Sequence, residues 1–159
     1  MKYFLSFILL VFINCNSKDE LNQKPNVILI MADDIGFECL SINGSTSYKT
    51  PVLDSLALNG VNFSKAISQP LCTPSRVKIM TGKHNFRNYK HFTYLNSNQK
   101  TFGNLFKENG YKTAIVGKWQ LNGIKIKAVD KNISQDNKMP YVLGFDEYSL
   151  WQLTKTNDL

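Results

Sequence analysis

Apolar runs separated by turn residues divide this chain of 159 residues into alternating predicted strands and helices. Residues 26–32 (NVILIMA) form an uninterrupted apolar run, as expected for a central parallel strand covered on both faces. Two shorter runs predict strands at residues 61–66 and 111–116. Helices are predicted at residues 50–57 and 101–109, because each begins at a threonine cap and a glycine follows each one. This alternation is typical of α/β proteins.

Residues 71–82 (LCTPSRVKIMTG) predict a further helix, on which the functional interpretation depends. Thr73 is the expected N-cap, Pro74 sits where a missing N–H has no cost, and the final glycine is expected to end the helix. Cys72 then lies at a helix N-terminus, where unpaired N–H groups favour anions. Arg76 adds a charged fork suited to sulfate or phosphate. These features predict a nucleophile beside an anion site; the alternative is a buried, inert cysteine opening an ordinary helix.

Apolar residues on the other two helices are expected to pack inward. They are Val52, Leu53, Leu56 and Ala57 on the first, and Phe102, Leu105 and Phe106 on the second. The segment between the helices, residues 83–99, is polar and aromatic, so it either lines a substrate groove or packs as a surface loop. Its two histidines, His84 and His91, have no partner at metal-ligand spacing and are not expected to bind a metal. Residues 122–140 are Lys-rich and predict a surface excursion, after which residues 141–153 become apolar and aromatic again.

The N-terminal residues have the pattern of an export signal. Residues 1–14 carry one early cation and then an apolar run too short to span a bilayer, which predicts a secretory signal peptide. Cys15 follows at the position where a bacterial lipoprotein signal places the lipidated cysteine, and simple secretion is the alternative. Residues 15–24 are polar and predict a solvated tether. We therefore expect an exported protein, periplasmic or at the cell surface, whose contact with the outer membrane is through a lipid anchor at Cys15.

Composition and charge narrow the classes of function that remain possible. The length suits one domain or part of one, and the formal net charge of +7 favours acidic substrates, with a solvated basic surface as the alternative. Nothing further supports nucleic-acid binding, so no such partner is expected. Three scattered cysteines are too few for a disulfide framework or a zinc site, and Cys39 is expected to be a packed or partly exposed thiol.

Two carboxylates, Asp33 and Asp34, end the first predicted strand and are followed by Gly36. Carboxylates at the carboxyl end of a central strand suit a hard cation, and a plain turn is the alternative interpretation. The third predicted strand leads into Lys118 and Gln120 at the same edge of the sheet.

Three motifs together resemble the type I sulfatases. Cys72-Thr73-Pro74-Ser75-Arg76, with Thr81-Gly82 downstream, is similar to the family signature in which the cysteine is oxidised to formylglycine. Asp33-Asp34-Ile35-Gly36 resembles the family's first-strand metal motif. Gly117-Lys118-Trp119-Gln120-Leu121 resembles a family motif that carries histidine where this chain has Gln120, and glutamine cannot take up a proton near neutral pH.

The resemblance implies an α/β fold of the alkaline-phosphatase-like sulfatase type, a sandwich around a mixed, largely parallel sheet to which residues 141–153 return. It implies that a maturation enzyme converts Cys72 to formylglycine, and that Asp33, Asp34 and the modified Cys72 bind Ca²⁺ or Mg²⁺. Arg76 and Lys118 would steady the nucleophile and developing charge, and Gln120 would take the place of the histidine.

Residues 25–159 resemble only the first third or so of a sulfatase, the N-terminal part of the catalytic domain. The family's remaining metal ligands come from later strands, so we expect the chain as printed to be a fragment with little activity and an unpaired sheet edge. For the complete protein, the expected function is hydrolysis of sulfate esters, with sulfated polysaccharide or oligosaccharide as substrate. The alternatives are a phosphoester or phosphonate hydrolase, a non-catalytic lipoprotein that binds sulfated glycans, and a gene fragment with no role.

Overall fold

The computed structural model describes residues 24–124 and 137–153. The predicted signal peptide, Cys15 and nearly all of the tether lie outside these residues. The chain divides into two units, Met1–Ala32 and Asp33–Leu159, and the helices, strands and core of the described residues belong to the second unit. Within the described residues, no helix combines the length and apolar character needed to cross a bilayer.

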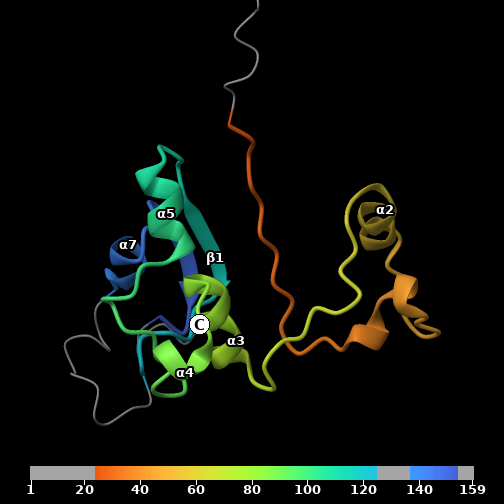
Figure 1. The fold of residues 1–159 in the computed structure, drawn as a ribbon, viewed down its shortest axis with the longest axis horizontal. Coiled ribbons are helices and arrows are strands. Elements are labelled where there is room, and N and C mark those ends of the chain that lie inside the picture. Colours follow the sequence, from red (N-terminus) through yellow and green to blue (C-terminus); the bar gives the residue numbers. More distant parts are fainter. Residues whose placement is uncertain (1–23, 125–136, 154–159) are drawn as a thin grey trace, which may run out of the picture. The chain divides into compact units, whose positions relative to one another are not determined.

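Short helices precede a small parallel sheet in the second unit (Figure 1). In chain order the elements are η3 (Phe37–Cys39), η4 (Ser41–Asn43), α2 (Pro51–Asn59), α3 (Cys72–Thr81), α4 (Asn85–Asn88), α5 (Phe102–Glu108), β1 (Ala114–Lys118), α7 (Met139–Val142) and β2 (Glu147–Trp151). The predicted helices at residues 50–57 and 101–109 are therefore confirmed, as α2 and α5. Pro51 opens α2 after Thr50, as predicted.

β1 and β2 pair in parallel, with Ala114 opposite Glu147 and Lys118 opposite Trp151. The prediction that the last apolar segment returns to the sheet is confirmed. The predicted strand at residues 111–116 begins three residues late, because Thr113 binds the β2 end of the chain with its side chain. The Thr113 hydroxyl donates to Gly144 O at 2.7 Å, and the Thr113 N–H donates to the Asp146 carboxylate at 3.1 Å.

Two other predicted strands are wrong for this structure. Residues 26–32, in the first unit, and residues 61–66 have no strand assignment, and the sheet of the described residues consists of β1 and β2. A strand exists only where a neighbouring backbone completes its hydrogen bonds, and an apolar run alone supplies no such neighbour. The side chains remain open to solvent: Ile28 is 84% exposed and Val61 is 77% exposed.

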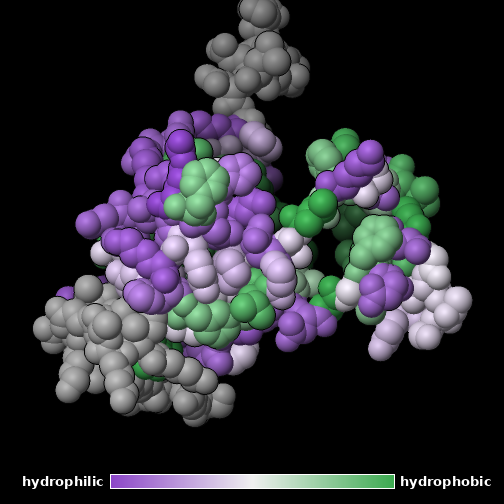
Figure 2. Space-filling model, turned by 60° about the horizontal axis from the view of Figure 1, so that its bottom comes forward, coloured by the Kyte–Doolittle hydropathy of each residue, from purple (hydrophilic) through white to green (hydrophobic). Residues whose placement is uncertain are grey.

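The predicted inward packing of α2 is also wrong. Val52 and Leu56 are 72% and 62% exposed, and α2 has no buried residue. Polar contacts tie this helix to the η4 segment instead: the Asp54 carboxylate accepts from the Ile42 N–H at 3.1 Å, and the hydroxyl of the N-cap residue Thr50 accepts from the Ser41 N–H at 2.9 Å. Figure 2 shows hydrophobic residues standing on the surface among hydrophilic ones, which agrees with these exposures.

α5 packs as predicted at its N-terminus but not along its full apolar face. Thr101 and Asn104 form the capping box, in which the Thr101 hydroxyl accepts from Asn104 N–H and the Asn104 side chain accepts from Thr101 N–H. The Thr101 hydroxyl also donates to Leu143 O at 2.6 Å. Gly103 allows this approach, since a Cβ there would lie 2.6 Å from the same oxygen. Leu105, predicted to be inward, is 53% exposed.

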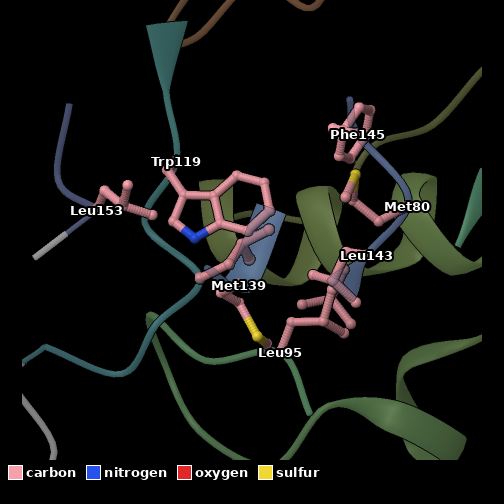
Figure 3. Packing of buried hydrophobic residues seen from close by; sticks show 9 residues of the cluster. Met80, Leu95, Trp119, Met139, Leu143, Phe145 and Leu153 are labelled. Carbon is pink, nitrogen blue, oxygen red and sulfur yellow. The ribbon is translucent and has the colours of Figure 1, made fainter. Parts of the chain in front are cut away.

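One hydrophobic core joins the sheet, the α3 helix and the turn after α7 (Figure 3). Its buried members are Val77, Met80, Leu95, Trp119, Leu121, Met139, Leu143, Phe145 and Leu153. The Trp119 ring meets the Phe145 ring edge-on, with centroids 6.5 Å apart. Trp119 is 1% exposed and directly follows Lys118, so the core fixes the chain at the point where β1 delivers its polar residues.

Candidate active site

α3 begins at Cys72, and its start is built differently from the prediction. The N-cap is Leu71 and Thr73 lies inside the first turn. The predicted cap is wrong because the buried Thr73 hydroxyl accepts from the backbone N–H of Thr93 at 3.2 Å, a tertiary contact. Ser75 stabilises the helix start by donating from its hydroxyl to Leu71 O at 2.9 Å. The helix ends at Gly82 in the left-handed conformation (φ 63), as predicted.

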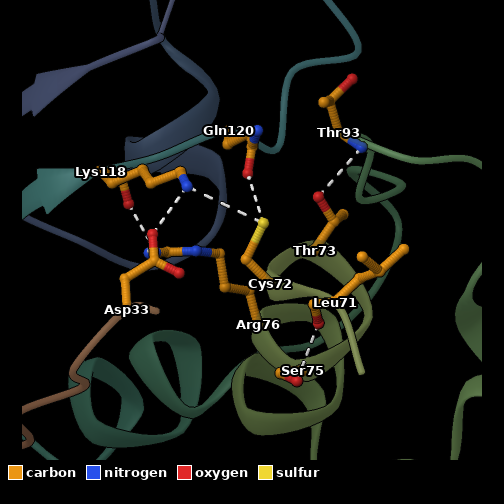
Figure 4. A network of polar contacts seen from close by, with 9 residues as sticks. All are labelled: Asp33, Leu71, Cys72, Thr73, Ser75, Arg76, Thr93, Lys118 and Gln120. Carbon is orange, nitrogen blue, oxygen red and sulfur yellow. Dashed lines mark hydrogen bonds and ion pairs between the residues drawn. The ribbon is translucent and has the colours of Figure 1, made fainter. Parts of the chain in front are cut away.

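The Cys72 side chain faces two polar groups from the carboxyl end of β1 and the residues just after it (Figure 4). Its Sγ donates to the Gln120 amide oxygen at 3.1 Å, and the Lys118 ammonium lies 3.8 Å from the same sulfur. Cys72 is partly exposed, so the thiol is accessible. Cys72 is therefore not the fully buried residue of the alternative interpretation.

Lys118 and Arg76 converge on one carboxylate, that of Asp33. Lys118 Nζ lies 2.6 Å from Asp33 Oδ2, and Arg76 lies 3.5 Å from the same oxygen. Arg76 also donates to the backbone oxygen of Lys118 at 2.6 Å, which joins α3 to the end of β1. The Lys118 hydrogen bond, followed by the charges of Lys118 and Arg76, lowers the pKa of Asp33 against the opposing effect of burial. Asp33 is therefore a carboxylate at neutral pH.

The backbone around Gln120 is held on both sides. The Trp119 N–H donates to Trp151 O at 3.0 Å, and its indole N–H donates to the Asn122 side chain at 2.6 Å. On the other side Leu121 is buried, and its carbonyl accepts from Leu95 N–H at 2.9 Å. Between these fixed points Gln120 adopts a left-handed backbone (φ 54). These contacts direct its amide toward Cys72.

Within residues 24–124 and 137–153, three of the four non-glycine residues with positive φ belong to or adjoin this site: Asp34 (φ 55), Thr93 (φ 65) and Gln120 (φ 54). A left-handed backbone is rare for a β-branched residue, and strained residues concentrate at functional sites. Sequence reasoning did not single out Thr93, because a threonine in a polar loop carries no motif. Its contribution comes from its backbone, which contacts Thr73 next to Cys72.

The described residues do not form a complete metal centre. Asp33 and Asp34 are adjacent in the chain, yet among residues 24–124 and 137–153 no group of three His, Cys, Asp or Glu side chains is arranged to hold a metal ion. A calcium ion takes about six to eight oxygen ligands. The acidic pair supplies at most part of that set, and the Asp33 carboxylate is here engaged by two cations. The His84 ring stacks on Phe86, and the His91 ring lies tilted against Tyr94.

The sulfatase family model matches residues 25–158. The chain belongs to the sulfatase family. Human arylsulfatase D is 33% identical over 168 residues, an alignment that covers 97% of this chain and 28% of the human protein. The crystal structure of Ps i-CgsB in complex with k-i-k-neocarrahexaose has a TM-score of 0.67 and 34% identity, over 81% of this chain and 28% of that one. BT4656, solved in complex with its substrate D-glucosamine-2-N,6-O-disulfate, has a TM-score of 0.62 and 31% identity. This similarity covers 79% of this chain and 23% of BT4656.

These similarities confirm the predicted family and the alkaline-phosphatase-like sulfatase fold, of which this chain shows helices and a small parallel sheet. The sulfatase chain spans about a quarter of the length of the relatives named above. The structure brings together Cys72, Arg76, Lys118, Gln120 and Asp33, all predicted as site residues, and leaves Asp34 exposed beside them.

Proposed function

We propose that the complete protein hydrolyses sulfate esters at the site around Cys72. The observation that carries the proposal is the arrangement of Lys118 and Arg76 beside the first residue of α3 in a chain of the sulfatase family. A sulfate ester is a monoanion, and negative charge builds up on its bridging oxygen as the S–O bond breaks. Fixed cations next to position 72 stabilise that charge more strongly than water does, because they need no reorganisation.

The proposal includes conversion of Cys72 to formylglycine by a maturation enzyme. The surroundings fit such a group: Gln120 Oε1 accepts a hydrogen bond from whatever donor stands at position 72, and Lys118 faces an acceptor there. When present, the hydrated aldehyde supplies the oxygen nucleophile for the ester sulfur. Overall, the ester S–O bond breaks, the alcohol leaves with a proton, and water supplies the new oxygen of the sulfate.

Gln120 orients the group at position 72 without exchanging a proton. An amide oxygen accepts hydrogen bonds but does not ionise near neutral pH, so Gln120 holds a hydroxyl in place and leaves proton transfer to water or to other groups. We propose that Asp33 and Asp34 contribute two carboxylates to a Ca²⁺ or Mg²⁺ site. Such an ion would supply charge neutralisation for the sulfate.

We propose sulfated polysaccharides or oligosaccharides as the substrate class. The net charge of +7 attracts polyanions, and two structurally similar proteins were solved in complex with k-i-k-neocarrahexaose or with D-glucosamine-2-N,6-O-disulfate. We also propose that the protein is exported, on the basis of the predicted signal peptide and Cys15, and such polymers are met outside the cytoplasm.

Mass spectrometry of the protein, purified from a host that has the maturation enzyme, tests these proposals together. We expect the peptide with Cys72 to carry an aldehyde in place of the thiol, and the mature N-terminus to be an acylated Cys15.

Cys72→Ala should lower kcat/KM for an aryl sulfate by more than about 10³-fold. Cys39→Ala, at a half-buried thiol outside the site, is the matched control and should retain activity.

An unmodified Cys72, or a Cys72→Ala variant as fast as the wild type, would contradict the proposed nucleophile. Faster turnover of the corresponding aryl phosphate than of the aryl sulfate would favour a phosphoester hydrolase built on the same residues.

A further inference from the structure

A second polar and aromatic cluster lies on α4, the four-residue helix that follows α3. Two asparagines fix α4 to α3: the Asn85 amide donates to Pro74 O at 2.9 Å, and the Asn88 amide donates to the Thr81 hydroxyl at 2.5 Å. These residues are three apart, so they share one face of the helix. The two residues between them consequently point away from α3.

Those two residues, Phe86 and Arg87, form an exposed platform with the residues just before the helix. Phe86 is 84% exposed, and the His84 ring stacks parallel to it, with centroids 5.8 Å apart. The Arg87 guanidinium lies 5.9 Å from the Phe86 centroid. Lys83 stands at the edge and donates to the Gln99 side chain at 3.0 Å. We call Lys83, His84, Phe86 and Arg87 the α4 platform.

The platform lies in a stretch of the chain that contains no carboxylate. Between Asp54 and Glu108 there is no Asp or Glu, whereas the same residues include eight cations: Lys65, Arg76, Lys78, Lys83, Arg87, Lys90, Lys100 and Lys107. Three of the eight, Arg76, Lys100 and Lys107, form ion pairs with acids outside the stretch. None of the salt bridges among the described residues includes Lys83 or Arg87, so their charges face the solvent uncompensated by a carboxylate contact.

The hydrogen bonds of Asn85 and Asn88 also hold the platform beside α3, the helix that begins at Cys72. Pro74, which accepts from Asn85, is two residues after Cys72 in the first turn of α3, and Thr81 is the last residue of that helix. Ten helical residues span about 15 Å. These contacts fasten α4 to α3 at both of its ends, so the platform is held in a fixed position on the helix that carries Cys72.

We propose that the α4 platform binds a further sulfated sugar unit of an oligosaccharide whose scissile sulfate lies at Cys72. The exposed Phe86 ring contacts the apolar C–H face of the sugar, and the Arg87 fork and Lys83 ammonium bind its sulfate. This subsite deepens the proposed function, on which its choice of ligand rests. It acts in binding and takes no part in the S–O bond cleavage.

Kinetics with two substrates test the platform in the complete protein. Phe86→Ala, Arg87→Gln and the double variant are compared with wild type on an aryl sulfate and on the preferred member of a panel of sulfated hexasaccharides. We expect kcat/KM for the hexasaccharide to fall by about 10-fold or more in the double variant, through KM, while turnover of the aryl sulfate stays within about twofold. Leu58→Ala, at another exposed apolar residue of the chain, and Lys112→Gln, at an exposed cation before β1, are matched controls and should change neither.

Direct binding separates this inference from the proposed function. Calorimetry with the Cys72→Ala variant measures the affinity for the hexasaccharides and for their desulfated forms without turnover. We expect affinity to drop on desulfation and again, by about 10-fold, with Phe86→Ala/Arg87→Gln. Tight binding without hydrolysis by wild type would refute the proposed reaction and leave the platform standing.

The platform is refuted if the double variant binds the hexasaccharides as tightly as its parent. It is equally refuted if no sulfated hexasaccharide binds more tightly than its desulfated form, or if the aryl sulfate and the hexasaccharide lose activity to the same extent.

Discussion

Replacement of Lys118 by methionine removes the cation nearest to position 72 and keeps the length of the aliphatic side chain. Lys118 Nζ lies 3.8 Å from Cys72 Sγ, and the side chain is 17% exposed. At about 4 Å and an effective dielectric constant of about 20, a unit charge interacts with a full negative charge by about 4 kcal/mol. Only part of a charge develops in a transition state, so we expect a loss of about 3 kcal/mol, or about 10²-fold in kcat.

The measurement is steady-state turnover of an aryl sulfate by the complete protein. Lys118→Met should lower kcat far more than it changes KM, whereas Lys118→Arg, which keeps the charge, should lose only about 10-fold. Lys112→Met is the control for removing a cation from the segment that leads into β1. Thermal unfolding must show that the Lys118 variants remain folded, because Asp33 then keeps, within the described residues, Arg76 alone as a cationic partner, at 3.5 Å. A folded Lys118→Met variant within threefold of wild-type kcat would refute the assignment of Lys118 to the reaction.

Two further predictions concern the framework of the site. Trp119→Ala should lower the free energy of unfolding by about 3–5 kcal/mol, because Trp119 is 1% exposed in the core, and it should also lower activity. A loss below about 1 kcal/mol, measured by denaturant unfolding, would contradict this prediction. The hydrogen bond from Lys107, with those from Thr113, lowers the pKa of Asp146 from its ordinary value of 3.8 to about 2. The stabilisation from the ionised Asp146 is therefore present above about pH 3.8 and is lost as the pH falls toward 2. Asp146→Asn should unfold more easily at neutral pH, and its free energy of unfolding should depend less on pH between about 2 and 3.8. An unchanged acid-unfolding profile would contradict the role of this carboxylate.

Local sequence signals were sufficient to predict those features that depend only on residues close together in the chain. Thr101 caps α5 and Gly82 ends α3 as predicted, because capping needs only residues a few positions apart. The same holds for the chemical identity of the site: Cys72, Arg76, Lys118 and Gln120 stand at motif spacing, and the structure brings their side chains together. Sequence signals failed where the outcome depended on distant partners. Residues 61–66 form no strand, since an apolar run does not specify a neighbouring backbone to pair with. The helix α2 exposes its apolar side, since its sequence does not specify an apolar surface to pack against.

The sequence alone determined which functional groups this chain of the sulfatase family carries, and its family, because motifs are properties of residue order. The tertiary structure decided how those groups are held. It moved the cap of α3 from Thr73 to Leu71 by engaging Thr73 with Thr93, and it turned Gln120 toward Cys72 by fixing the residues on either side in the core. It also paired Lys118 with Asp33, residues that lie 85 positions apart. Contacts of that kind depend on which surfaces meet when the chain packs, and the order of residues does not by itself state which surfaces those will be.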